Sequence, residues 1–173
     1  QIELRILAHL SKDKALKNAF DKGEDVHART AADIFGSSLD QVDENSRRMA
    51  KAVNFGIIYG LSAFGLSRQL KISRKDAQDF IGQYFSLYSN VKDFMDNTVA
   101  KARECGYTLT MFNRRRYLPD LKSDNRQVRE SAERIAINSP IQGSAADLIK
   151  VAMIRLSRNL KKIKLNSKMI LQV

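Results

Sequence analysis

Four side chains with the chemistry to hold a phosphorylated ligand recur at every fourth position between residues 47 and 59. Arg47 and Lys51 are cations, and Phe55 and Tyr59 carry large aromatic rings. On an α-helix this spacing forms one row that spans roughly 18 Å of helix axis. Cations bind phosphate oxygens and rings stack on bases. The order therefore predicts a nucleoside triphosphate that lies along the helix with its phosphates on Arg47 and Lys51.

The other side of this helix is apolar, so the row is expected to face away from the core. The apolar arc comprises Met49, Ala52, Val53, Gly56 and Ile57. Two cations alone are more often a solvated face than a binding site. The two rings need a ligand or a second packing partner, because leaving each in water forgoes roughly 1.5–3 kcal/mol. Ile58 lies near the row, so a packing partner stays open as the alternative.

Three other features could add to such a site, and each also has a structural interpretation. Glu3 lies in the first turn of a predicted helix, where a carboxylate complements the helix dipole. His27 is by itself more often a surface or capping histidine, and we treat His9 as structural. The run 114–116 is three arginines on a predicted turn, which suits duplex phosphates but could be a solvated charge run.

The elements that carry these residues are predicted to be mainly α-helices. Two prolines and eight glycines leave long segments with apolar residues at three- and four-residue spacing. Ser73 to Asp76 has the spacing of a capping box, and Gly106 suits a helix end. The predicted helices are Ile2 to Leu10, Asp13 to Lys22, Val26 to Phe35, Asp43 to Tyr59, Ala63 to Leu70, Arg74 to Tyr84, Ser89 to Cys105, Asn125 to Asn138 and Ser144 to Leu160.

Two breaks in this helical pattern are expected. Tyr107 to Phe112 is β-branched and aromatic enough for a short strand, which predicts half of a hairpin before Leu118 to Asp120. Pro140 is expected to end one helix, and Gly143 with Ser144 to begin the next. Without an internal repeat or linker, one compact unit is predicted.

Charge and composition narrow the class of partner. Thirty Lys and Arg against nineteen Asp and Glu give a formal charge of +11, which favours nucleic acid or nucleotide, with an acidic membrane surface as the rival. No apolar run approaches the roughly 18 residues of a membrane span, so we expect a soluble intracellular protein. The single Cys105 cannot form an internal disulfide, and no Cys/His cluster has zinc-ligand spacing.

The ends of the sequence predict an excerpt of a longer chain. It begins with Gln1 instead of Met, and it stops inside an apolar, strand-like run from Lys168 to Val173. After Asp147 the chain holds basic residues and no further acid, so this stretch is not expected to hold a metal ion.

The fingers helix of bacterial family A DNA polymerases has a motif that resembles the row at every defining position. The matching residues are Arg47, Lys51, Phe55, Gly56, Tyr59 and Gly60. By this resemblance Arg47 holds the γ-phosphate end and Lys51 the phosphates nearer the reacting centre, and both act on charge that develops in transfer, as catalytic residues. Phe55 stacks by the incoming sugar and base, and Tyr59 guards the template position. A Phe at position 55 implies discrimination against dideoxynucleotides.

Two further segments are similar to the dNTP-binding parts of this family. Gln1 to Arg5 resembles the tail of a catalytic motif, which makes Glu3 the steric gate that excludes a ribose 2′-hydroxyl. Asp25 to His27 resembles the segment of a phosphate-contacting histidine, which makes His27 a dNTP ligand.

The DNA-binding residues implied by the resemblance lie in the last third of the chain. Arg114, Arg115 and Arg116 resemble a Gly-Arg-Arg-Arg pattern, with Asn113 in place of glycine; Asn tolerates a left-handed backbone, so the turn is expected to survive. The segment from Glu133 to Asp147 also matches the family. It implies primer-template contacts from Arg129, Arg134, Asn138 and Gln142, of which the amides suit minor-groove acceptors shared by all base pairs. Unaided, these amides around a proline are more often loop hydrogen bonders.

The resemblance implies a fold and an activity. Residues 1–12 would be a palm segment, 13–138 the fingers subdomain, and 139–173 a palm helix and strand, which adds short β segments and a hairpin to a mainly α fold. The activity would be template-directed DNA synthesis on dNTPs and primer-template DNA by a monomer in the bacterial cytoplasm, associated with the nucleoid. Two magnesium ions would be held by carboxylates outside these residues, so the excerpt alone is expected to be inactive.

Two other interpretations stay open. A non-catalytic helical nucleic-acid-binding module explains the charge and the arginines but not the row from Arg47 to Tyr59. A single-subunit RNA polymerase can share the Lys and Tyr-Gly elements, and Glu3 argues against it.

Overall fold

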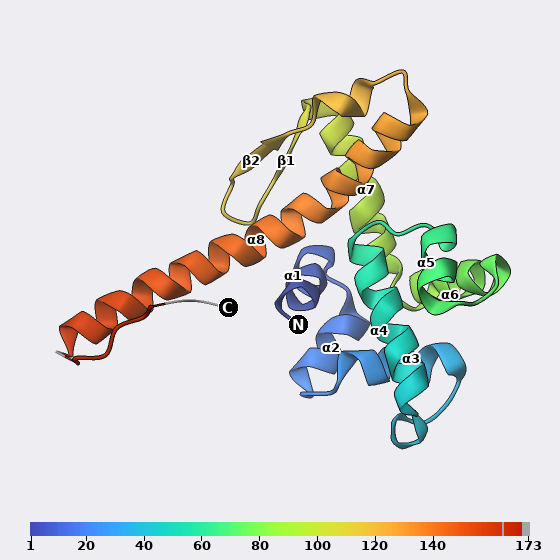
Figure 1. The fold of residues 1–173 in the computed structure, drawn as a ribbon, viewed down its shortest axis with the longest axis horizontal. Helices are drawn as coiled ribbons and strands as arrows, with labels where there is room; N and C mark the ends of the chain where they lie inside the picture. Colours follow the sequence, from blue (N-terminus) through green and yellow to red (C-terminus); the bar gives the residue numbers. More distant parts are fainter. Residues whose placement is uncertain (164, 171–173) are drawn as a thin grey trace.

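The computed structural model describes residues 1–163 and 165–170 and is mainly helical (Figure 1). Its first six α-helices are α1 (Ile2–Ser11), α2 (Lys14–Asp21), α3 (Val26–Phe35), α4 (Glu44–Ile58), α5 (Ala63–Leu70) and α6 (Arg74–Leu87). After them come α7 (Ser89–Cys105), the strands β1 (Tyr107–Leu109) and β2 (Arg115–Tyr117), and the long α8 (Arg126–Lys162). Short 3-10 turns cover Leu39–Gln41 and Pro119–Lys122.

Local capping explains why most predicted helices have the expected ends. The side chain of Asp25 accepts hydrogen bonds from the first backbone N–H groups of α3, and Ser73 accepts one from the N–H of Asp76 at 3.0 Å. Gly106 ends α7 in a left-handed conformation, with φ 80°. The bounds predicted for α3, α5 and α7 are confirmed. The helix predicted to end at Tyr84 continues for three more residues to Leu87.

The predicted break at Pro140 is wrong, because α8 is continuous from Arg126 to Lys162. A proline inside a helix removes one backbone hydrogen bond and clashes with the preceding turn, at a cost of about 3 kcal/mol or more. Burial offsets this cost: Ile141 is 0% exposed in the main core, Ala136 is 0% exposed in a smaller cluster, and Pro140 itself is buried. Tertiary packing on α1 and α7 thus overrides the local preference.

One hydrophobic core holds α4 in place. The helix packs against α3, α5 and α6 and also reaches α8. Its inner residues Val53, Ile57 and Ile58 are at most 5% exposed and belong to the same cluster as Leu4 of α1 and Tyr84 of α6. Figure 1 shows α3, α5 and α6 gathered around α4.

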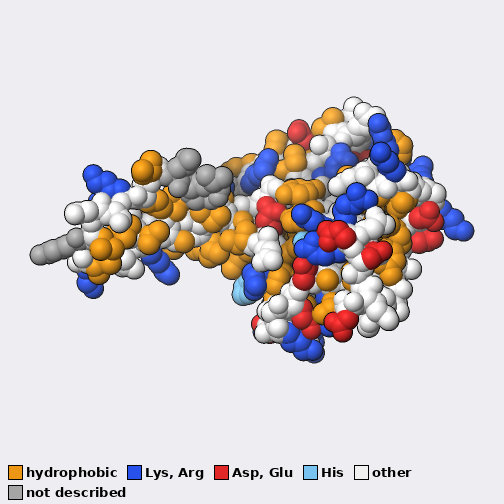
Figure 2. Space-filling view, turned by 60° about the horizontal axis from the view of Figure 1, so that its bottom comes forward, with side chains coloured by type: hydrophobic (Ala, Val, Ile, Leu, Met, Phe, Trp, Pro, Cys, Tyr) orange, Lys and Arg blue, Asp and Glu red, His pale blue; other side chains and the backbone are white. Residues whose placement is uncertain are grey.

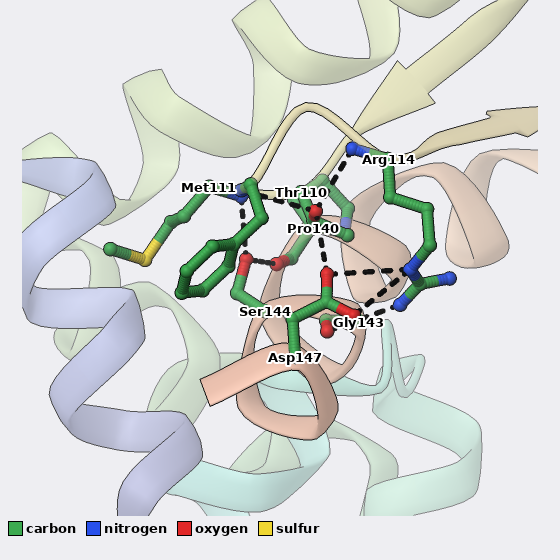
Figure 3. Close-up of polar contacts among 8 residues, drawn as sticks. Thr110, Met111, Arg114, Pro140, Gly143, Ser144 and Asp147 are labelled. Carbon is green, nitrogen blue, oxygen red and sulfur yellow. Dashed lines mark hydrogen bonds and ion pairs between the residues drawn. The ribbon is translucent and has the colours of Figure 1, made fainter. Parts of the chain in front are cut away.

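The predicted hairpin is confirmed, and it is locked onto α8. Thr108 pairs with Arg116 in an antiparallel register, and the turn contains Asn113 with φ 60°, as the tolerance of asparagine for a left-handed backbone predicts. The first strand ends at Leu109 rather than Phe112 because the chain turns there. A hydroxyl hydrogen bond joins Thr110 of the turn to Asp147 of α8 at 2.8 Å (Figure 3).

The C-terminal half of α8 projects away from the other helices (Figure 1). It carries exposed apolar side chains, and orange hydrophobic side chains are visible on the projecting part in Figure 2. In α8 these side chains are Leu148, Ile154 and Leu156, and the exposed Ile163 follows directly after the helix. Residues 168–170 are not in a strand, and the rest of the predicted terminal strand lies outside the described residues. Within the described part of the chain, no helix is long and apolar enough to cross a membrane.

Gly60, just after α4, must be glycine for two reasons. Its φ is +64°, and a Cβ there would lie 2.7 Å from Cγ of Arg134 on α8. We predict that Gly60→Ala lowers the free energy of unfolding by about 1–3 kcal/mol, through backbone strain and overpacking. Urea unfolding of the two proteins measures the difference.

Gly82→Ala is the matched control for this substitution. It lies inside α6, and no described atom comes within 4 Å of the added Cβ. The control should be neutral or stabilising by up to about 1 kcal/mol. Equal effects of the two substitutions would contradict the explanation.

Candidate nucleotide-binding site and nucleic-acid interface

The predicted row on α4 faces away from the core, as its opposite apolar face requires. Lys51 is exposed, Phe55 is half-buried and Tyr59 is 43% exposed. The rings of Phe55 and Tyr59 are stacked, with centroids 6.5 Å apart. Ile58 is 0% exposed and belongs to the main core. The outer face of α4 therefore presents the cation-to-ring order that the sequence predicted.

Arg47 is held at the phosphate end of the row by an acid from another helix. Its guanidinium donates to one carboxylate oxygen of Asp25 at 2.8 and 3.0 Å, while the other oxygen of Asp25 caps α3. Burial acts to raise the pKa of Asp25, but hydrogen bonds from Arg47 and from the N–H groups of Ala28 and His27 outweigh it and lower the pKa. Asp25 therefore stays ionised and orients Arg47.

His27 lies under the row as a buried side chain. It is 7% exposed, and its ring centroid lies 5.6 Å from that of Phe55. Burial lowers the pKa of His27; the charge of Asp25 opposes this shift, while Arg47 and Lys51 add to it. The surface or capping interpretation does not describe this histidine, because it is buried and Asp25 caps the helix.

Glu3 of α1 meets the other end of the row. The hydroxyl of Tyr59 donates a hydrogen bond to Oε2 of Glu3 at 3.2 Å, although the residues are far apart in sequence. The structure thus brings the six predicted nucleotide ligands together. Arg47, Lys51, Phe55, Tyr59 and Glu3 follow one another along this surface, and His27 is buried beneath it beside Phe55.

A polar hollow of about 340 Å³ continues this surface between α4, β2 and α8. Its lining comprises Tyr59, Arg116, Ser131, Arg134, Ile135, Asn138 and Gln142. Four of the seven predicted DNA-binding residues are therefore together: Arg116, Arg134, Asn138 and Gln142. The Oδ1 atom of Asn138 is buried and has no hydrogen-bond partner among the described residues. Buried polar atoms normally have a partner, so this acceptor is one that the described part of the protein leaves unpaired.

The remaining three arginines have contacts within the protein. Arg114 binds the carboxylate of Asp147 at 3.0 Å and the carbonyl of Gly143 at 3.2 Å, which ties the hairpin to α8 (Figure 3). Arg115 lies 4.9 Å from the ring centroid of Tyr107. Arg129 donates to the carbonyl of Ser123 at 2.9 Å. Arg114 and Arg116 thus lie on one side, where both line a small cavity next to Gln142, while Arg115 turns to Tyr107. Of the three, Arg116 lines the polar hollow.

Metal binding requires several ligand side chains that lie close together. Within residues 1–163 and 165–170, no three His, Cys, Asp or Glu side chains lie close enough together to hold a metal ion. The described residues therefore do not form a metal site by themselves.

Sequence patterns had not identified two residues that organise this site. Asp25 orients Arg47, and the fully buried Asn54 of α4 contacts His27, with its Nδ2 3.1 Å from Nδ1 of the ring. No sequence pattern pointed to Asn54, which lies outside the apolar arc predicted for this helix. The pairing of Asp25 with Arg47 joins residues 22 positions apart and had no local pattern.

We predict that Asp25→Asn slightly lowers the free energy of unfolding at neutral pH, because the amide still caps α3 but no longer pairs with Arg47. The folded-state pKa of Asp25 is lowered, so its contribution is present above the unfolded pKa and is lost as pH falls through the folded pKa. The two proteins should therefore converge in acid. Urea unfolding at neutral and acidic pH tests this, with the exposed Asp124→Asn as control; a difference that is constant with pH would contradict it.

Comparison with known proteins gives the family. Residues 1–173 match the model of DNA polymerase family A. Over its whole length the chain is 57% identical to the DNA polymerase I of Caldicellulosiruptor bescii, of which it covers 20%. It is 53% identical to the DNA polymerase I of Mycobacterium leprae, of which it covers 19%. It thus spans about a fifth of these curated relatives.

A solved structure gives the same result for the fold. It is the POL domain of Pol1 from M. smegmatis in complex with DNA primer-template and dNTP, and it matches with a TM-score of 0.96 and 52% identity, over 100% of this chain and 30% of that one. Since the family model matches from the first residue to the last, the chain belongs to DNA polymerase family A.

Proposed function

We propose that the chain binds an incoming dNTP and primer-template DNA for template-directed DNA synthesis, as part of a longer DNA-directed DNA polymerase. One observation carries the proposal: Tyr59 ends the row on α4 and also lines the hollow on α8. A nucleotide on the row would therefore have its base where a duplex in the hollow ends. The neighbouring structure from M. smegmatis supports it, since that protein binds both ligands.

The four residues of the row, with His27 and Glu3, would act on different parts of the nucleotide and its template. Arg47 and Lys51 would bind the phosphates and stabilise the charge that develops during transfer, as the catalytic residues of this segment. His27 would add a phosphate contact. Phe55 would stack on the sugar and base, and Tyr59 would hold the template position. Glu3, fixed by its bond with Tyr59, would exclude a ribose 2′-hydroxyl.

The hollow on α8 would check the duplex without choosing its sequence. Asn138 and Gln142 line it with Arg116 and Arg134, so amides and cations face one space. Amides suit the minor-groove acceptors that all base pairs share, and guanidinium groups suit phosphates. Arg114, Arg115 and Arg129 would support this surface or reach DNA by exchanging their present contacts.

The remaining proposals concern the longer polymerase. Residues 1–12 and 139–173 would join its palm, and 13–138 would form the fingers. Magnesium ions would be held by carboxylates outside this chain and would supply the activation of the primer hydroxyl, so residues 1–173 alone would be inactive. We propose a monomer that acts on the bacterial chromosome in the cytoplasm, in keeping with its bacterial relatives.

We predict that Lys51→Ala, in a polymerase chain that contains these residues, raises the KM for dNTPs and lowers kcat/KM at least about tenfold. The reason is the loss of one charge-assisted hydrogen bond to phosphate. Steady-state primer extension measures both constants. Lys92→Ala is the control, because Lys92 pairs with Asp96 on α7. Unchanged dNTP kinetics in the Lys51 variant would favour the non-catalytic binding module.

We predict that Gln142→Ala weakens primer-template binding about fivefold, by the loss of a hydrogen bond in the hollow. The effect should be similar for duplexes of different sequence, because minor-groove acceptors are shared by all pairs. Fluorescence anisotropy with labelled duplexes measures the dissociation constants. Gln127→Ala, in the first turn of the same helix, serves as control. A loss confined to one sequence would count against geometric readout.

A further inference from the structure

A buried chain of polar side chains joins the nucleotide row to the interior of the fold. The Nδ2 atom of Asn54 lies 3.1 Å from Nδ1 of His27 and 3.1 Å from Oγ1 of Thr30. The Thr30 oxygen in turn lies 3.0 Å from the hydroxyl of Tyr88. Asn54 and Thr30 are 0% exposed, and Tyr88 is 1% exposed. Water has little access to these groups, so they must satisfy one another.

The protons available to these hydrogen-bonded side chains fix the orientation of the Asn54 amide. The Thr30 hydroxyl has a single proton, and its shortest acceptor is the carbonyl of Val26 at 2.7 Å. Thr30 must therefore accept from its other two neighbours. Tyr88 can donate, since burial raises the pKa of Tyr88 to about 12. The amide nitrogen of Asn54 is the second donor; its oxygen is farther from Thr30, at 3.4 Å.

The second N–H of the Asn54 amide then points to Nδ1 of His27, which must accept. A ring nitrogen that accepts carries no proton, so the imidazole is neutral and its proton is on Nε2. We propose that Asn54 is a positioning residue that holds His27 in this tautomer, so that His27 meets a phosphate only as a hydrogen-bond donor. This inference deepens the proposed function and rests on it for the identity of the ligand.

The opposite tautomer would harm phosphate binding. With its proton on Nδ1, His27 would present a lone pair on Nε2 to phosphate oxygens, which repel it. Asn54 excludes this state, because its own N–H occupies the Nδ1 side. The hydrogen bond from Asn54 to the ring therefore decides whether His27 attracts or repels a triphosphate.

Burial and the nearby cations also favour the neutral form of His27. Burial lowers the pKa of His27, as do Arg47 and Lys51 of α4, while Asp25 at the start of α3 opposes the shift. In an imidazolium, Nδ1 would carry a proton that faces the N–H of Asn54, so two donors would repel each other. His27 should therefore stay neutral, and its contact with phosphate should not change with pH near neutrality.

The first test is to measure the tautomer directly, in a polymerase chain that contains these residues and carries 15N-labelled histidine. The His27 resonances are assigned by their loss in His27→Gln. Between about pH 6 and pH 8, around the ordinary histidine pKa, we expect an unprotonated Nδ1 and a protonated Nε2. A proton on Nδ1 at neutral pH, in either the neutral or the charged ring, would overturn the proposal. This measurement uses the unaltered protein and does not depend on dNTP binding.

The second test is Asn54→Asp, read by the pH dependence of the dNTP KM. The new carboxylate would accept from Nδ1 and raise the pKa of His27. At high pH the neutral ring would then carry its proton on Nδ1, and KM should rise about tenfold through loss of a hydrogen bond to phosphate. As pH falls through the raised pKa, the imidazolium donates from both nitrogens and KM should recover. The unaltered enzyme should show a flat KM.

The control is the double variant of Asn54→Asp with His27→Gln, in which the pH dependence of KM should vanish because no imidazole remains. A merely structural role of Asn54 would instead lower kcat at every pH and leave KM without a titration, which would overturn the proposal. Should Asn54→Asp fail to fold, the NMR result on the unaltered protein decides. Lys51→Ala tests the proposed function separately, since the tautomer is measured in the unaltered protein and without dNTP.

Discussion

Burial of the inner face of α4 determines the direction of every side chain on its outer face. Val53, Ile57 and Ile58 are held in the main core by α3, α5 and α6. Successive residues of a helix turn by 100°, so Lys51 lies on the side of α4 away from the buried Val53 and Ile57 and points outward. A rotation by one residue would move apolar area into water and an ammonium toward the core, and both changes are unfavourable. The packing of one face thus orients the other.

The second surface depends on how closely α8 approaches the end of α4. Gly60 has no side chain, so the stem of Arg134 can pack against its backbone. The hairpin is fixed to the same helix by Thr110 and Arg114, both bound to Asp147 (Figure 3). These contacts bring residues from three separate parts of the sequence to one hollow. They also explain why the row and the hollow share Tyr59 as a boundary.

Arg47 makes an ion pair that a phosphate group could replace. Arg47 is oriented by Asp25, but both side chains are more than a third exposed, so water screens this pair strongly. A triphosphate could therefore replace the carboxylate at small cost and find the guanidinium already near its bound position. His27 differs, because its contacts are buried and its pKa is lowered mainly by that burial. The site thus combines an exchangeable cation with a fixed neutral donor.

The sequence by itself determined the helical class, most helix bounds, the hairpin and the order of the row on α4. These features depend on local spacing, capping residues and turn residues, which act over a few positions. Tertiary structure decided that α8 continues through Pro140, since burial of Ala136 and Ile141 outweighs the lost backbone bond. It also decided that Arg115 turns away from Arg114 and Arg116, that Asp25 orients Arg47, and that Asn54 contacts His27. Such pairings join residues 22 to 33 positions apart, and no local pattern fixes them.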